Sequence, residues 1–196
     1  MAKYEIKDGV AIIPEGIEMI EDRAFLNCTE LKRVVIPQGV RRIGKSAFLG
    51  CENLEVVELP EWLEVIGEHA FEFCSSLKEL TLPQWVKRIE NYAFSSCSSL
   101  QKFSIPSSVT HIGDWAFHGC TSLTHITIPL SVTSIERNTF HRCTSLTQIT
   151  IPPSVTSIRD YAFSRCTSLT LVKVSKNTEL EENAFWNCPN LKIEHY

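Results

Sequence analysis

Residues 112–129 read IGDWAFHGCTSLTHITIP, and this stretch decides the fold because most of the chain repeats it. Its cysteine returns every 23 residues, and its phenylalanine and proline return with the same period. The recurring residues are Cys28, Cys51, Cys74, Cys97, Cys120, Cys143 and Cys166; Phe25, Phe48, Phe71, Phe94, Phe117, Phe140 and Phe163; and Pro14, Pro37, Pro60, Pro83, Pro106, Pro129 and Pro152. Three residue types that share one period indicate a repeat protein, in which stacked units bury a common core.

The pattern inside one repeat predicts the path of the chain. We number positions within a coil from its proline, which is position 0. Aliphatic residues fill positions 3 and 6. Ala-Phe fills 10 and 11, with Thr139 the one exception to Ala in the complete coils. Cys follows at 14 and Leu at 17, and apolar residues return at 20 and 22. The last of these positions alternate apolar and polar residues, which is typical of a half-buried strand that the next proline ends. The Ala-to-Cys spacing of four residues predicts a short helical or 3₁₀ turn.

These elements predict a single domain over residues 1–196, an α/β-type solenoid of about eight 23-residue coils with parallel strands. Residues 1–13 are expected to form an N-terminal hairpin or cap, because Asp8-Gly9 lies between two strand-like segments. Residues 14–174 hold seven complete coils. Residues 175–196 are expected to form a degenerate closing coil, in which Ser175 replaces the proline and charged residues are frequent.

The composition limits the classes of function. The chain is 43% hydrophobic and carries a net charge of -4, which argues against nucleic-acid binding because such proteins need a basic surface. No segment approaches the roughly 18 uninterrupted apolar residues of a membrane helix, so we expect no insertion into a membrane. The segment from Met1 to Val10 is polar and does not resemble a secretory signal peptide.

The sequence holds no motif of a known catalytic or cofactor site. It has no G-x-G-x-x-G, no phosphate-binding loop, no H-E-x-x-H and no G-x-S-x-G. We therefore expect a protein that is not an enzyme and that needs no cofactor and no metal. A catalytic group assembled from distant residues stays an open alternative, since such groups form in space.

The cysteines and histidines each have a structural interpretation. Because every cysteine occupies the same place in its coil, they are predicted to form one inward-facing ladder of reduced thiols without disulfides. No C-x-x-C pair exists, so the usual zinc spacing is missing. His118 and His141 share position 12 and are predicted to stack on the outer surface, where a metal or pH-sensing role is the alternative to simple solvation.

Two segments resemble the BspA-like leucine-rich repeats of bacterial surface antigens. Ile112 to Cys120 and Thr121 to Ile135 are close to the consensus of that family, and the resemblance extends over residues 10–192. It implies a right-handed superhelix with the strands on the concave face, which would leave the short helical or 3₁₀ turns on the convex side. It also implies a role in adhesion or protein recognition, at the cell surface or outside the cell.

The outward residues of the predicted strands are the candidate binding site, because solenoids usually bind partners on this surface. Positions 19 and 21 supply Arg33, Val35, Val56, Glu58, Glu79, Thr81, Lys102, Ser104, His125, Thr127, Gln148 and Thr150. The bland alternative is a solvated sheet face of strand-forming residues. The exposed threonines of the later coils recur with the period of the repeat, as they do on ice-binding proteins. Ice binding is therefore another alternative, although His125 and Gln148 interrupt the threonine columns.

Two tryptophans extend this candidate site. Trp62 and Trp85 both occupy position 2 of their coils, where most other coils carry Gly or Ser, so they are predicted to be neighbours just past the strand edge. Aromatic side chains are frequent at the energetic centres of protein interfaces. A further column at position 9 holds His69, Tyr92, Trp115 and Tyr161, which are expected to pack partly between coils.

The sequence thus favours a monomeric, non-catalytic module that binds an unidentified protein, such as a host or matrix protein, through its strand face. The alternative is a structural role, as a spacer, a fragment of a longer surface repeat array or an engineered repeat scaffold.

Overall fold

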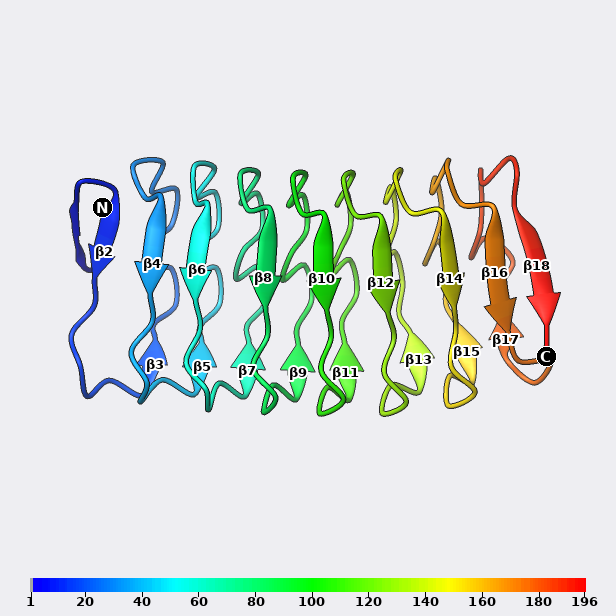
Figure 1. Ribbon diagram of the computed structural model, residues 1–196, viewed down its shortest axis with the longest axis horizontal. Helices are drawn as coiled ribbons and strands as arrows, with labels where there is room; N and C mark the ends of the chain where they lie inside the picture. Colours follow the sequence, from blue (N-terminus) through cyan, green and yellow to red (C-terminus); the bar gives the residue numbers. More distant parts are fainter. Residues whose placement is uncertain (1) are drawn as a thin grey trace.

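The computed structural model describes residues 2–196, which form a solenoid of about eight coils of roughly 23 residues. Figure 1 shows the coils stacked in one row, with the two termini at opposite ends. This arrangement confirms the predicted repeat and its parallel strands. Each coil contributes a three- or four-residue strand, a two-residue strand and a segment of turns.

The longer strands stand side by side on one surface, which we call the strand face (Figure 1). Their central residue points into the core and the residues on either side point outward, as the burial pattern exposed–buried–exposed of most of them shows. The strands are β4 (Arg33–Val35), β6 (Val56–Glu58), β8 (Glu79–Thr81), β10 (Lys102–Ser104), β12 (His125–Thr127), β14 (Gln148–Thr150), β16 (Leu171–Val174) and β18 (Lys192–His195).

The two-residue strands form a second set of parallel ladders, which we call the second sheet. They include the aliphatic residue of position 6, which is buried in every complete coil. The strands are β3 (Met19–Ile20), β5 (Arg42–Ile43), β7 (Val65–Ile66), β9 (Arg88–Ile89), β11 (His111–Ile112), β13 (Ser134–Ile135), β15 (Ser157–Ile158) and β17 (Glu179–Leu180).

The N-terminal end carries an antiparallel hairpin of β1 (Glu5–Lys7) and β2 (Val10–Ile12). Asp8 and Gly9 form its turn with φ of 52° and 81°, the left-handed conformation that an Asp-Gly hairpin turn requires. β2 also pairs in parallel with β4, so the hairpin continues the ladder of the strand face. At the other end β18 pairs with β16, and the hydroxyl of Tyr196 donates a hydrogen bond to the carbonyl oxygen of Ile151.

The core consists of straight columns of like residues. The seven phenylalanines of position 11 are fully buried, and each ring stacks on the next with centroids 5.1 to 5.5 Å apart. The cysteine thiols form a parallel column, and from Cys51 onward each donates to the phenylalanine carbonyl oxygen of the preceding coil over 3.0 to 3.3 Å. The cysteines are free, and only Cys188, in the closing coil, is less than fully buried.

The segment on the third side of each coil differs from the sequence prediction. The described residues contain no α-helix and no 3₁₀-helix, so the predicted helical or 3₁₀ turns are wrong. In the coil of Phe117, the N–H groups of Trp115, Phe117 and Gly119 donate to carbonyls of the next coil over 2.8 to 3.0 Å. The alternate N–H groups, those of Ala116, His118 and Cys120, close turns within the coil. A helix needs hydrogen bonds within the segment from consecutive N–H groups. Here every second N–H donates to the next coil instead, so a helix cannot form.

Left-handed residues enforce the same interruption. Trp115 and Gly119 have φ of 60° and 69°, and the equivalent positions 9 and 13 are left-handed in every complete coil. A right-handed helix cannot pass through such residues. The spacing of four between Ala and Cys therefore reflects a chain of β-turns, which we call the turn face and which covers positions 8–14 of each coil.

The ladders are not continuous along the row. On the strand face, β6 pairs only with β4 and β8 only with β10, so the ladder is open between β6 and β8. Within residues 2–196 it is open again between β12 and β14, and the second sheet is open between β11 and β13. The turn-face bonds run through these junctions, so the coils stay stacked while the strands separate.

Candidate protein-binding face

The strand face presents all twelve of the strand residues that the sequence proposed. Every one of them, from Arg33 on β4 to Thr150 on β14, is exposed. Parallel register brings them together: Arg33 lies opposite Val56 and Val35 opposite Glu58, while Glu79 and Thr81 lie opposite Lys102 and Ser104. His125 and Thr127 follow on β12, next to β14, which carries Gln148 and Thr150. The geometry places these residues on one surface without assigning them a role.

The charges on this face are unevenly compensated. Arg33 forms an ion pair with Glu58 across neighbouring strands, both side chains being half exposed. Glu55 and Glu79 form no ion pair with any residue of the described chain, 2–196. Lys102 lies opposite Glu79 in register without an ion pair. The opening between β6 and β8 is therefore lined by three glutamates, two of them available to a partner, while Lys78 and Lys102 lie beside Glu79 at its margin.

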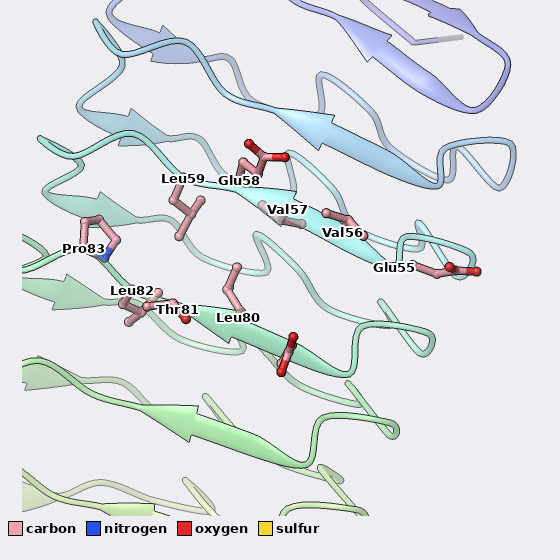
Figure 2. Close-up of a pocket in the computed structure, with 10 residues that line it drawn as sticks. Glu55, Val56, Val57, Glu58, Leu59, Leu80, Thr81, Leu82 and Pro83 are labelled. Atoms are coloured by element: carbon pink, nitrogen blue, oxygen red, sulfur yellow. The ribbon is translucent and has the colours of Figure 1, made fainter.

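A hollow of about 590 Å³ lies where the ladder opens between β6 and β8 (Figure 2). Val57, Leu59, Leu80 and Leu82 supply apolar side chains to it, and Glu55, Glu58 and Glu79 supply carboxylates. Val57 and Leu59 are only partly buried, whereas their counterparts Leu80 and Leu82 on the next coil are buried. The open ladder thus turns core positions of one coil into the floor of a groove.

The backbone also contributes to this groove. Where neighbouring strands pair, the N–H of position 18 donates to its counterpart in the preceding coil, as Glu55 does to the carbonyl of Lys32 and Gln101 to that of Lys78, over 2.8 and 3.0 Å. Across the open junction, Lys78 makes no such bond to Glu55 within the described residues. Unpaired strand groups of this kind are a template for another extended chain.

Trp62 and Trp85 border the strand face where the coils turn away from it. Their ring centroids are 5.2 Å apart, which confirms the predicted neighbourhood, and 44% and 48% of their surfaces are exposed. They belong to the coils of β8 and β10 and follow β6 and β8 directly in the chain. They therefore add exposed apolar surface beside the strand face.

The second sheet carries a ladder of ion pairs instead of a groove. The carboxylate of Glu64 accepts from Lys87 and from Arg41, each over 3.1 Å and from neighbouring coils. The hydrogen bond from Lys87, its Coulombic attraction and then the bond from Arg41 lower the pKa of Glu64 below its usual value. These pairs neutralise part of the charge on this surface, while Arg42 on β5 forms no ion pair within residues 2–196.

The histidine pair proposed by the sequence is present. The rings of His118 and His141 lie 5.3 Å apart on the turn face. They are half-buried rather than solvated, and burial together with the neighbouring positive charges lowers the pKa of His141 to about 4. No group of three metal-ligating side chains occurs within residues 2–196, and none of its elements is a helix long enough to cross a membrane.

Sequence reasoning missed the floor of the groove. Val57 and Leu59 occupy positions 20 and 22, which the repeat assigns to the core, and Glu55 lies one residue before the strand. The only available signal was the concentration of glutamates at the exposed positions of two adjacent coils. The break in the ladder itself depends on the spacing of whole coils and leaves no mark in the repeat pattern.

Stacked 23-residue coils with parallel strand ladders and an inward column of Leu, Phe and Cys define a leucine-rich-repeat solenoid. Residues 9–98 and 76–192 match the family described as the BspA type leucine rich repeat region, in six copies. The chain belongs to this family. No protein with a curated description matches it.

Several solved bacterial structures are similar to the chain. A leucine rich repeat protein of T. pallidum shares 35% identity over 72% of this chain and 68% of its own, with a TM-score of 0.70. A leucine rich cell surface protein of Faecalibacterium prausnitzii shares 28% over 90% and 62%, with a TM-score of 0.62. A leucine-rich repeat protein from Bacteroides ovatus, 24% identical over 95% and 66%, has a TM-score of 0.72 and supports the fold alone. The chain therefore spans about two thirds of the length of these proteins.

Proposed function

We propose that the chain is a protein-binding module of a bacterial surface repeat protein, without catalytic activity, and that the strand face is its binding surface. The observation that carries the proposal is the groove between β6 and β8, where apolar floor, free carboxylates and unpaired strand groups meet. Membership of a repeat family whose members generally interact with proteins supports it. The description of one similar structure as a cell surface protein supports a surface location.

The chemistry of the groove specifies the kind of partner. Glu55 and Glu79 favour a segment with Lys or Arg side chains, because opposite charges across an interface steer association and select partners. Val57 and Leu59 favour an apolar side chain between these basic residues. An extended segment could also pair with the open strand groups, as peptides do when they add to a sheet edge. The Trp62–Trp85 pair offers a flanking aromatic contact.

A selection from a display library of 12-residue peptides tests the proposal with a defined probe. The expected peptides combine basic and apolar residues, and Glu79→Lys should weaken the binding of the best of them at least tenfold. Glu18→Lys is the matched control, because Glu18 is also exposed but lies beside the second sheet. Peptides that are acidic, or that bind the Glu79→Lys variant as well as the unchanged chain, would refute the proposal.

A second candidate function is that of a spacer within a longer array. Its support is the regular column of stacked coils and the fact that the chain spans only part of its relatives. A spacer predicts that no selected ligand depends on the strand face. The same display selection therefore separates the two candidates, since binding that depends on Glu79 belongs only to the first.

A further inference from the structure

A second hollow lies on the turn face, at the C-terminal end of the row and away from the strand residues. It measures about 470 Å³, and its lining includes Trp115, Asn138, Arg142, Tyr161, Arg165 and Trp186. These residues come from four successive coils. None of the residues that line it is acidic.

The hollow exists because the aromatic column of position 9 is interrupted. His69, Tyr92 and Trp115 stack on one another with centroids 4.7 and 5.8 Å apart. Asn138 takes the next place in the column, and Tyr161 follows one coil later. Two coils separate Trp115 from Tyr161, which is about 10 Å at the usual strand spacing. The small amide of Asn138 leaves the column without a ring at position 9 of this coil, and the ring of His141 from the same coil lies beside Trp115 instead, with centroids 5.8 Å apart.

The charge of the hollow is positive and uncompensated. Arg142 and Arg165 both occupy position 13, in successive coils, so their backbones lie about 5 Å apart at the usual strand spacing. Neither guanidinium forms an ion pair within the described part of the chain, although Arg33, Arg41, Arg88 and Arg159 all do. Two adjacent guanidiniums without a carboxylate suit an anion that accepts paired hydrogen bonds.

His141 lines the hollow without adding charge at neutral pH. Burial is the main reason that its pKa falls to about 4, and the positive charges of His118, Arg142 and Arg165 add to the effect. Both arginines line the same hollow as this ring. The anion-binding capacity therefore belongs to the arginines.

The aromatic walls distinguish between kinds of anionic ligand. The rings of Tyr161 and Trp186 meet edge to face, at 74° with centroids 6.5 Å apart, and Arg165 lies over the Trp186 ring at 5.1 Å. Perpendicular walls do not make the parallel slot in which a flat nucleobase stacks on both sides. They do fit a chair-shaped sugar ring, whose C–H groups pack on one aromatic face while its hydroxyls point to polar neighbours such as Asn138.

We propose that this hollow binds an acidic sugar at the end of a glycan. Arg142 and Arg165 hold its carboxylate or sulfate, Tyr161 and Trp186 pack against the ring, and Asn138 hydrogen-bonds a hydroxyl. The site is separate from the strand face, so it gives the module a second specificity, directed at glycosylated surfaces. It does not depend on the function proposed for the groove between β6 and β8.

Titration of the isotope-labelled full chain, followed by nuclear magnetic resonance, tests this site with four probes: D-glucuronate, D-galactose 6-sulfate, neutral D-galactose and adenosine monophosphate. We expect the two acidic sugars to shift the indole N–H signals of Trp115 and Trp186 in a saturable way. Their relative affinities separate a carboxylate ligand from a sulfate ligand. Equal binding of neutral galactose, or tighter binding of the nucleotide, would overturn the proposal.

Substitution of the arginines supplies the decisive control. Arg142→Ala and Arg165→Ala should each weaken the acidic sugar about tenfold or more, because each removes one charge-assisted contact. Arg42→Ala is the matched control, since Arg42 is exposed and unpaired within residues 2–196 but lies on β5 of the second sheet. The amide spectrum of each variant shows whether it is folded. Unchanged affinity in both variants, or no saturable shift with either acidic sugar, would contradict the site.

Discussion

At the scale of the residue, the phenylalanine column contributes the largest fully buried side chains of the core. Phe94 is fully buried, stacks between Phe71 and Phe117 at 5.4 and 5.5 Å, and meets Phe103 edge to face at 4.9 Å. Such contacts add to the free energy gained by removing a large apolar side chain from water. Because coils contact only their neighbours, the loss of one ring leaves a cavity that distant coils cannot fill.

We predict that Phe94→Ala lowers the free energy of unfolding by about 3–5 kcal/mol, as for other large buried aromatic residues. Urea denaturation followed by circular dichroism measures the change. Phe73→Ala is the control, since Phe73 is 50% exposed and should lose less than about 1 kcal/mol. A loss for Phe94→Ala no larger than that of the control would mean that the ring column is not the core.

The sequence predicted the residue columns well, because residues that are 23 positions apart in the chain occupy equivalent positions in successive coils. Cys97 and Phe94 point inward as their period requires. It could not predict which core positions would become partly exposed, as Val57 does. That outcome depends on the distance between coils, which no single repeat specifies.

At the scale of the element, the turn face shows why a spacing rule was misleading. The Ala-Phe-x-x-Cys interval matches one turn of a helix, yet the N–H of Phe117 donates to Thr139 of the next coil. A helix would satisfy these donors inside the coil and leave the neighbouring coil unbonded. The array of turns is favoured because it bonds coil to coil on a third side, in addition to the two strand surfaces.

Gly119 tests the left-handed turn positions, since its φ is 69° and a Cβ there would meet only ordinary contacts, the nearest at 3.4 Å from Ser96. We predict that Gly119→Val lowers the free energy of unfolding by about 1–2 kcal/mol, the cost of a left-handed conformation for a branched residue. Gly119→Asn should change it by less than half as much, because Asn tolerates this region. Thermal and urea denaturation compare the two variants, and equal losses would show that backbone strain is not the cause.

The open ladder between β6 and β8 makes a second prediction at this scale. The amide protons of Lys78 and Glu79 should exchange with deuterium at least tenfold faster than those of Glu55 and Val56, which are bonded to Lys32 at 2.8 and 3.1 Å. Hydrogen exchange resolved by nuclear magnetic resonance measures all four amides in one sample. Equal protection on both strands would mean that the ladder is closed in solution and that the groove is absent.

At the scale of the whole molecule, the cysteines act as one long column. Their burial raises the thiol pKa values above the usual 9.0, to about 12 for Cys51 and Cys120, so the folded state keeps them protonated. In the unfolded chain the same thiols ionise near pH 9. Between pH 9 and 12 the unfolded state therefore holds fewer protons, and stability must fall as the pH rises.

We predict an alkaline loss of stability that begins near pH 9, to which each fully buried thiol adds up to about 1.4 kcal/mol per pH unit. Denaturation at a series of pH values between 8 and 11 measures the slope. Cys120→Ala should reduce the slope by the share of one thiol, whatever its effect on stability at pH 7. A slope that the variant leaves unchanged would assign the alkaline loss to other groups.

The architecture of the molecule could be predicted from the sequence, and its binding sites only in part. The 23-residue period by itself is enough to place Arg33, Glu58 and Glu79 on one exposed face. The groove and the hollow at Arg142 and Arg165 arise where neighbouring coils depart from the consensus. The effect of such departures on the surface depends on which residues of the neighbouring coils lie beside them in the stack.

The distance between equivalent residues in different coils tests the central claim, a single row of coils in register, most directly. Spin labels at Val35 and Thr127, and at Val35 and Lys173, span four and six coils along one column of the strand face. Pulsed electron resonance should give backbone separations of at least about 19 and 29 Å, because the spans include open junctions where the strands lie farther apart than in a paired ladder, and the second should exceed the first. A second distance equal to or shorter than the first would contradict the stacked row, and with it the strand face on which the proposed function rests.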